Sequence, residues 1–240
     1  MPVKMNPIEP SAGDAILVGD PRRAFSLAQE LTVQPRMSHQ ARGLWGYRGE
    51  TERGRQLTVQ STGSGGPAAV PIIGDLADQG ASRLIRLGTC VAADPAIKAG
   101  TILVVEKAIP MDGASGTIAP GASACLPNPD LLEALREVGQ AATISSHDLV
   151  ARFDLLGEKS PEAPGASARD LQTATVLAMA HRLKIPAAAI VVVAEDESGA
   201  RLDEDRLTEI FRAVGRSVIA ALPAPVGQQS KPKSKPEVEV

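Results

Sequence analysis

Three short turns carry the residues of this sequence that could do chemistry. They are residues 19–23 (Gly-Asp-Pro-Arg-Arg), 61–66 (Ser-Thr-Gly-Ser-Gly-Gly) and 86–89 (Arg-Leu-Gly-Thr). Small side chains let backbone N–H groups approach an anion closely, and helices that begin after the first two turns would add their positive ends. Arg23 and Arg86 supply the forked donors that phosphate oxygens favour. Together the turns predict an oxyanion site, with phosphate as the anion.

Other site chemistries lack their signatures. No Lys-Ser or Lys-Thr pair follows the glycines, so there is no Walker loop, and the glycine spacing is not that of a dinucleotide site. The three histidines show no metal-ligand spacing. Cys90 and Cys125 form neither a CxxC pair nor a disulfide framework, which indicates a reducing compartment. We therefore expect neither a metal nor a cofactor.

Strand-like and helix-like segments alternate along the chain. The strand candidates are residues 15–18, 56–60, 83–87, 101–105, 141–145 and 187–194, and the helix candidates are 21–31, 67–79, 130–138, 168–183 and 203–222. A polar stretch leads to Pro120, and Trp45 and Tyr47 are expected in a glycine-punctuated turn at an interface. The alternation predicts an α/β fold with a mostly parallel sheet, helices on both faces, and ligands at the carboxyl ends of the strands.

Composition limits the class of protein. The chain has 240 residues, of which 43% are hydrophobic and 22% charged, so a mostly disordered protein is excluded. A net charge of −3 gives no basic field for nucleic acid or a membrane surface, and only five aromatic residues could stack on bases. No apolar stretch reaches the length of a membrane span and no signal peptide is visible, so a cytoplasmic protein is expected.

In combination and order, these turns resemble the nucleoside phosphorylase family, most closely its uridine phosphorylase branch. The matching segments are residues 19–24, 38–39, 61–67, 86–89, 94–100, 112–115 and 119–120. The resemblance implies a single-domain, three-layer α/β/α phosphorylase-like fold with a mixed central sheet over residues 14–222. Residues 1–13 would be an N-terminal extension, and residues 223–240, which lack periodicity, a disordered tail.

The resemblance implies phosphorolysis of the N-glycosidic bond of a nucleoside, more pyrimidine-like than purine-like, to pentose 1-phosphate and free base. Inorganic phosphate would be a co-substrate. By position, Gly19, Arg23, Arg86 and Thr89 would bind phosphate. The ribose would lie against Thr89, Leu171 and Gln172. The family's hexamers, built of dimers, imply a homo-oligomer in which a histidine and an arginine of the adjacent subunit complete each site.

Several positions depart from the family pattern. Gln172 stands where the family has a ribose-binding glutamate, and Val91 where it has a glycine beside the base. The base readers are missing after residue 146, which leaves Val91, Arg152 and Phe153 as base-binding candidates. The catalytic aspartate of the purine enzymes falls near Glu195 or Asp196. The family's intersubunit arginine is replaced by Gln40, with Arg42 as a substitute; His39 could line the same subunit contact.

Two alternatives follow from these departures. One is a nucleosidase that uses water in place of phosphate, although Gln172 and Ala194 lack the carboxylates that such an enzyme needs. The other is a catalytically impaired relative that binds phosphate or a nucleoside without turnover.

Overall fold

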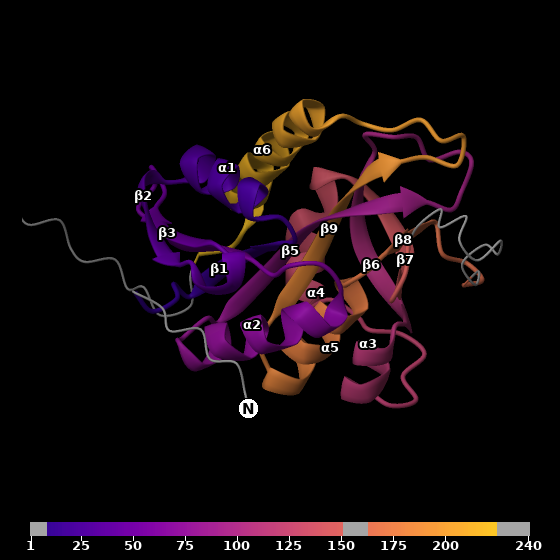
Figure 1. The fold of residues 1–240 in the computed structure, drawn as a ribbon, viewed down its shortest axis with the longest axis horizontal. Coiled ribbons are helices and arrows are strands. Elements are labelled where there is room, and N and C mark those ends of the chain that lie inside the picture. The colour runs from indigo at the N-terminus through magenta and orange to yellow at the C-terminus, as the bar shows by residue number, and fades with distance from the viewer. Residues whose placement is uncertain (1–8, 151–162, 225–240) are drawn as a thin grey trace, which may run out of the picture.

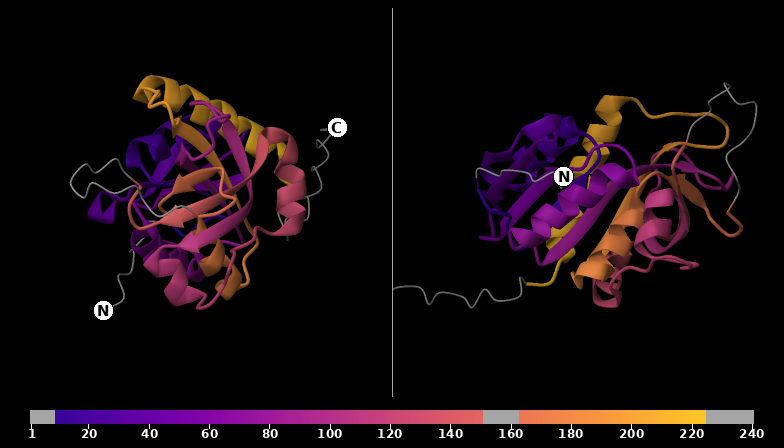
Figure 2. Two further views of the ribbon diagram at one scale, coloured as in Figure 1. Left: turned by 90° about the vertical axis from the view of Figure 1, so that its right-hand side faces the viewer. Right: turned by 60° about the horizontal axis from the view of Figure 1, so that its bottom comes forward.

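One nine-stranded sheet organises the chain in the computed structural model, which describes residues 9–150 and 163–224 (Figure 1). Its strands are β1 (Asp14–Val18), β2 (Val33–His39), β3 (Gly46–Glu50), β4 (Gln56–Ser61), β5 (Arg83–Ala92), β6 (Ile102–Met111), β7 (Gln140–His147), β8 (Ala168–Asp170) and β9 (Ala187–Glu195). Their order is β2-β3-β4-β1-β5-β8-β7-β6-β9, and β9 also pairs with β5. The last five strands therefore close into a ring, seen at the end of the molecule in the left view of Figure 2.

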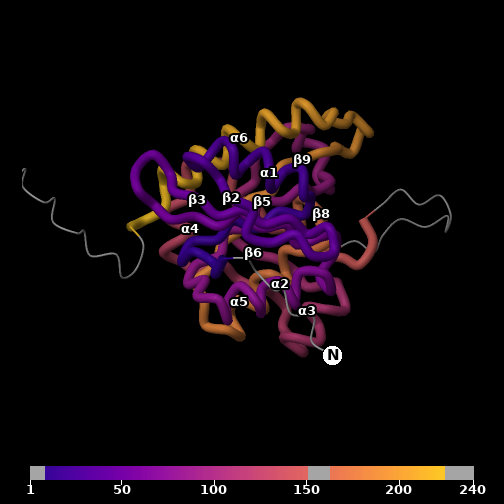
Figure 3. The backbone as a smooth tube through the Cα atoms, turned by 60° about the vertical axis from the view of Figure 1, so that its left-hand side comes forward, coloured from indigo at the N-terminus to yellow at the C-terminus, as the bar shows by residue number. Residues whose placement is uncertain are grey.

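Helices cover both faces of the sheet and make three layers (Figure 3). The layer above it in that view holds α1 (Pro21–Leu31) and α6 (Glu204–Ala221), and the layer below holds α2 (Gly66–Asp78), α3 (Gly113–Ile118) and α5 (Thr173–Leu183). The remaining helical segments are α4 (Pro129–Leu135), η1 (Ala41–Gly43) and η2 (Arg136–Val138). Two apolar clusters fill the spaces between the layers, one on each face. The expected single-domain α/β fold with a mixed sheet is confirmed.

Local signals explain the helices that the sequence predicted best. α1 begins with Pro21, and the Asp20 carboxylate accepts hydrogen bonds from the backbone N–H groups of Arg22 and Arg23. α6 is capped in the same way by Asp203, and its apolar stripe, which includes Phe211, is buried against the sheet and α1. These two helices therefore start and pack as the sequence indicates.

The parallel centre of the sheet brings the predicted turns to one edge. β1 lies between β4 and β5 and runs parallel to both. In the strand register, Val18 is paired with Ser61 of β4, and Leu17 is paired with Arg86 of β5. The turns that follow β1 and β4 therefore leave the sheet side by side, next to Arg86.

Five of the nine strand pairings among the described residues are parallel, as the predicted mostly parallel sheet requires, but several local elements were predicted wrongly. Among the described strands, β2, β3 and β4 pair antiparallel, as do β5 with β8 and β6 with β9. Tyr47 lies in β3 rather than in a turn, α3 occupies the polar stretch before Pro120, and β8 occupies the start of the predicted helix 168–183. The sequences of β2 (VQPRMSH) and β3 (GYRGE) show no regular alternation of apolar and polar residues. Their strand conformation therefore depends on pairing with neighbouring strands and could not be predicted from the local sequence.

The predicted tail is described only at Pro223 and Ala224, whose carbonyl groups accept hydrogen bonds from Arg83. Residues 225–240 lie outside the described residues. None of the helices in the described part of the chain is both long and apolar enough to cross a membrane.

Candidate functional site

The first two glycine turns touch each other at the sheet edge. The backbone N–H of Thr62 donates to the carbonyl oxygen of Val18 at 2.7 Å, and Thr62 Oγ1 lies 3.1 Å from the same oxygen. A Cβ atom on Gly19 would lie 3.5 Å from the carbonyl oxygen of Gly63. Gly63 itself has a φ of +74°, a conformation that favours glycine. The convergence predicted for these two turns is thus present.

The guanidinium of Arg86 lies over Gly88, two residues further along the same strand, β5. A Cβ atom at Gly88 would be 2.6 Å from the Arg86 Nη2 atom, so the glycine two residues later makes room for the guanidinium. The Arg86 side chain is only 6% exposed. The predicted third turn was wrong, because residues 86–89 lie inside strand β5 (Arg83–Ala92). The Arg-x-Gly pattern of this strand serves to bury a cation beside the first two turns.

Three side chains at the start of α5 surround the Arg86 guanidinium. Its Nη2 donates to Asp170 Oδ2 at 2.9 Å, its Nη1 to Gln172 Oε1 at 2.6 Å, and its Nε to Thr173 Oγ1 at 2.9 Å. Asp170 is fully buried, and a buried ion pair of this kind is costly unless further hydrogen bonds support it. Ser146 Oγ supplies one of these, donating to Asp170 Oδ1 at 2.6 Å.

The sequence reading missed Asp170 and Thr173. Asp170 also accepts hydrogen bonds from the backbone N–H and the hydroxyl of Thr173, the first residue of α5. The residue immediately before α5 is Gln172, whose side chain makes no capping hydrogen bond. Asp170 accepts from the first helical N–H from further upstream, so the usual helix-start signal could not have found it.

Gln172 links Arg86 to the second turn. Its Oε1 accepts from Arg86 and from Thr62 Oγ1 at 2.9 Å, while its Nε2 donates to the carbonyl oxygens of Gly63 and Gly65 at 3.1 and 2.8 Å. Both amide hydrogens and both carbonyl lone pairs are thus used. A glutamate could not donate to the two carbonyl groups. The ribose-binding role of Gln172 and of half-buried Leu171 stays a prediction.

Arg23 lies on the opposite side of the sheet from Arg86. Its guanidinium is 5.1 Å from the centroid of the Phe211 ring and 3.8 Å from Glu204 Oε2. Its Nε is shielded from solvent and has no hydrogen-bond partner among the described residues. The two arginines are therefore held by separate partners, and their joint contact with phosphate stays a prediction, as does that of half-buried Thr89.

The two acidic candidates for catalysis have structural partners. Glu195 Oε2 accepts from Arg201 Nη2 at 2.6 Å. Asp196 Oδ1 accepts from the hydroxyl and the backbone N–H of Ser198. The hydrogen bond from the Ser198 hydroxyl is the main cause that lowers the pKa of Asp196. An ionised Asp196 is poorly suited to donate a proton to a leaving base, so a catalytic role for either residue stays a prediction.

A cavity of about 280 Å³ lies beyond Val91. The lining residues are Ala93, Ser145, Ala163, Pro164, Gly165, Ala166, Arg169 and Glu197. Val91, the predicted base neighbour, is half-buried and lies opposite Arg169 in the antiparallel pairing of β5 with β8. The other two base-binding candidates, Arg152 and Phe153, lie outside the described residues.

His147 lies beside this cavity. Its Nε2 is 2.8 Å from Ser145 Oγ. Burial lowers the pKa of His147, and the neighbouring Arg169 guanidinium lowers it further. Burial also raises the pKa of the Cys90 thiol well above its ordinary value, so a reactive thiolate at Cys90 is disfavoured.

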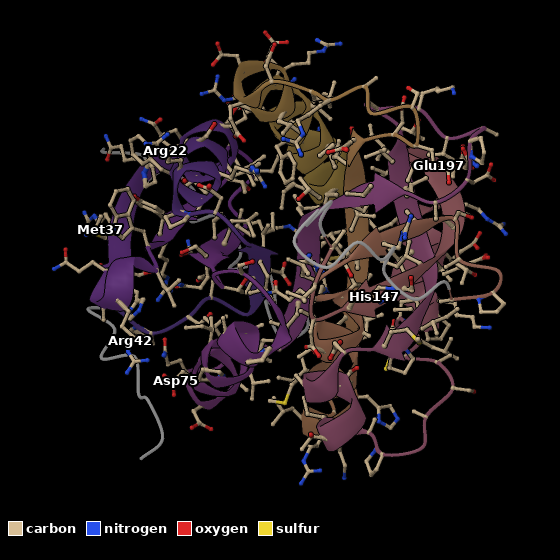
Figure 4. All side chains as sticks on the ribbon, turned by 45° about the vertical axis from the view of Figure 1, so that its right-hand side comes forward. Arg22, Met37, Arg42, Asp75, His147 and Glu197 are labelled. Carbon is tan, nitrogen blue, oxygen red and sulfur yellow. The ribbon has the colours of Figure 1, made fainter. Side chains whose placement is uncertain are left out.

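The residues expected to serve a neighbouring subunit lie elsewhere. Figure 4 shows Met37 and Arg42 along one edge of the molecule, far from His147 and Glu197. Arg42 is exposed, with a φ of +59°, whereas His39 is buried. Across residues 9–150 and 163–224, no group of three or more His, Cys, Asp or Glu side chains is placed to hold a metal ion.

Comparisons with known proteins agree on the family of folds. The sequence model of the phosphorylase superfamily matches residues 14–222. The chain is 31% identical to the uridine phosphorylase of Haemophilus influenzae over 133 residues, or 55% of this chain and 52% of that protein. It is 32% identical to a DeoD-type purine nucleoside phosphorylase of Oceanobacillus iheyensis over 98 residues, or 40% of this chain and 41% of that protein. The chain thus spans about half or less of the length of these curated relatives.

A solved structure shows the same fold. The purine nucleoside phosphorylase of Toxoplasma gondii, solved in complex with immucillin-H, aligns with a TM-score of 0.74 at 19% identity. The alignment covers 88% of this chain and 92% of that one.

Replacing Gln172 tests the central hydrogen-bond network. Gln172→Ala leaves the Arg86 Nη1, the Thr62 hydroxyl and two carbonyl groups without this partner, and each buried unsatisfied group costs about 1–3 kcal/mol. We expect the free energy of unfolding in urea to fall by about 2–5 kcal/mol. Gln140→Ala, at an exposed glutamine, is the matched control. Equal stabilities of the two variants would contradict the network.

The buried histidines predict a pH dependence of stability. Burial lowers the pKa of both His39 and His147, so folding favours their neutral forms and this stabilisation is complete above about pH 6.5. The free energy of unfolding should therefore fall as the pH drops from about 7.5 to about 5.5. His147→Gln should reduce this slope, whereas His181→Gln, at an exposed histidine, should keep it. An unchanged slope in His147→Gln would refute the assignment.

Proposed function

Because the chain belongs to the phosphorylase superfamily, we propose that it cleaves the N-glycosidic bond of a pyrimidine nucleoside with phosphate. The products are a pentose 1-phosphate and the free base. One observation carries the proposal: the two glycine turns meet beside the buried Arg86 guanidinium at the edge of the parallel strands. Backbone N–H groups and a guanidinium in one place are suited to an oxyanion.

The proposed chemistry needs positioning and charge rather than a protein nucleophile. As the bond between C1′ and the base breaks, the electron pair leaves with the base and the sugar becomes cationic. A phosphate oxygen then forms the new bond to C1′. Arg86 and the N–H groups of the turns would hold phosphate against the sugar, and Thr89 would contact the sugar itself. Arg86 would exchange its contact with Gln172 for one with phosphate.

A second candidate function is binding without turnover. The saturated hydrogen bonds of Gln172 and the ionised carboxylate of Asp196 favour it, because neither group is placed to assist the sugar or the leaving base. In that case the site would bind phosphate or a nucleoside, and the chain would act as a ligand-binding relative of the enzymes.

A panel of nucleosides, each incubated with and without phosphate, tests the proposal by release of free base. We expect release from pyrimidine nucleosides that depends on phosphate. Arg86→Gln should lower kcat/KM by about a hundredfold or more, because it removes a charge at the developing transition state. Arg136→Gln, at an exposed arginine, should leave kcat/KM unchanged. Circular dichroism establishes that both variants fold.

Each alternative has its own outcome in the same experiment. Base release without phosphate would replace the proposal with a nucleosidase. A rise of Tm with phosphate or a nucleoside, without base release, would support the binding candidate. Release from purine nucleosides alone would overturn the pyrimidine assignment.

The proposal includes a homo-oligomer, built of dimers and expected to be a hexamer. It is supported by large apolar side chains that are exposed near His39 and Arg42. These are Phe25, Val33, Met37 and Trp45, between 36% and 56% exposed, and such a patch is typical of an interaction surface. Each partner would offer the exposed Arg42 to its neighbour's site, because His39 is buried.

Light scattering coupled to size-exclusion chromatography tests this self-association. We expect the wild-type mass to be that of an oligomer, and Val33→Glu with Met37→Glu to shift it toward the monomer because charges are unfavourable at an apolar interface. Leu126→Glu, at a residue 63% exposed and outside the patch, should leave the mass unchanged. A monomeric wild-type chain would overturn the proposal.

A further inference from the structure

A buried cluster of three charged side chains lies at the edge of the sheet where the parallel strands begin, opposite to the glycine turns. Asp14 begins β1, Arg83 begins β5, and Arg55 stands immediately before β4. The Nη1 atom of Arg55 is 2.5 Å from Asp14 Oδ2, and the Nη1 atom of Arg83 is 3.4 Å from Asp14 Oδ1. The three side chains are between 3% and 12% exposed. Charges buried this deeply need paired and hydrogen-bonded partners.

The main chain after α6 supplies the remaining hydrogen-bond acceptors. Arg55 Nη2 donates to the carbonyl oxygens of Leu222 and Pro223, at 2.9 and 3.0 Å. Arg83 donates from Nη1 to the carbonyl oxygen of Pro223 at 2.8 Å, and from Nη2 to that of Ala224 at 3.2 Å. These three consecutive residues, which we call the strap, therefore connect the end of α6 to the starts of β1, β4 and β5.

The local sequence prepares the strap for this contact. A proline disfavours the helical conformation at the residue before it, and Leu222, which precedes Pro223, is extended with a φ of −63° and a ψ of 132°. The helix α6 therefore ends here. The Leu222 side chain is buried in the apolar cluster that α6 shares with the sheet. Since Phe211 of α6 packs on Arg23, the strap holds the far end of the helix that supports Arg23.

The charges of the cluster do not balance. Among the described residues, the two guanidiniums share the Asp14 carboxylate, and their other hydrogen bonds go to neutral carbonyl groups of the strap. Burial lowers the pKa of Arg83, Asp14 raises it, and the Arg55 guanidinium lowers it again. The negative end of the α6 dipole compensates part of the excess positive charge. A carboxylate would compensate it more fully, because charge-assisted hydrogen bonds are stronger than neutral ones.

We propose that Asp14, Arg55 and Arg83 form a binding site for extended main chain, that the strap is its occupant, and that the site accepts a carboxylate at the end next to Arg83. The two guanidiniums bind carbonyl oxygens, so they recognise the backbone of the strap and not its side chains. In this proposal the folded unit extends to Ala224. The role of the site is independent of the proposed phosphorolysis.

Arg83→Gln in the full chain tests the anchoring of the strap, with Arg53→Gln, at an exposed arginine in the turn that also carries Arg55, as the matched control. Because a buried charged cluster loses one member, we expect Tm to fall by about 5–15 °C. Hydrogen exchange followed by mass spectrometry should become about tenfold faster in the last turn of α6, where the Leu222 N–H donates to the Val218 carbonyl group, than in α5. Equal Tm values for the two variants, or exchange that rises equally in α5, would overturn the site.

Ala224→Asp tests the excess charge, and Ala224→Asn, which has the same shape without the charge, is its control. Ala224 is exposed, so either side chain can be accommodated. We expect the Tm of the Asp variant to be about 2–4 °C above that of the Asn variant. The difference should disappear when Arg83→Gln is added. Equal Tm values of the Asp and Asn variants, or a difference that persists with Arg83→Gln, would overturn the carboxylate assignment.

Discussion

The buried charge of Arg86 is the constraint on which the centre of this molecule depends. A guanidinium taken out of water must be surrounded by acceptors, and removing one partner of such a pair costs about 3–5 kcal/mol. Asp170, Gln172 and Thr173 provide these acceptors, although they lie more than 80 residues away in the chain. Their hydrogen bonds fix the start of α5 against β5, and Gly88 leaves the space for the guanidinium. The segment of β5 that carries Arg86 is therefore a meeting point of distant segments.

Gln172 extends this constraint to the glycine turn after β4. An amide can donate to two carbonyl groups and accept from a cation and a hydroxyl at once, whereas a carboxylate only accepts. All four hydrogen-bonding positions of this amide are used by the protein's own groups. Gln172 thus stabilises the contact between the glycine turn after β4 and Arg86.

The short strand β8 connects the two halves of the candidate site. Asp170 points to the face where Arg86 lies, and Arg169 points to the face that holds the cavity. Because neighbouring residues of a strand face opposite ways, one residue step separates the buried ion pair from Arg169, whose Nε has no hydrogen-bond partner among the described residues. A change in the pairing of β8 with β5 or β7 would move both side chains at once, so the register of this strand fixes the positions of Asp170 and Arg169 together.

The sequence by itself determined the elements whose signals are local. Helices α1 and α6, with their capping aspartates and apolar stripes, and the glycine turns after β1 and β4 could be predicted because neighbouring residues define them. Only the tertiary structure decided the partners of Arg86, the separate position of Arg23 against Phe211, and the existence of β2, β3 and β8. Each of these depends on pairing between segments far apart in the chain, and no local pattern of residue types records which segments meet.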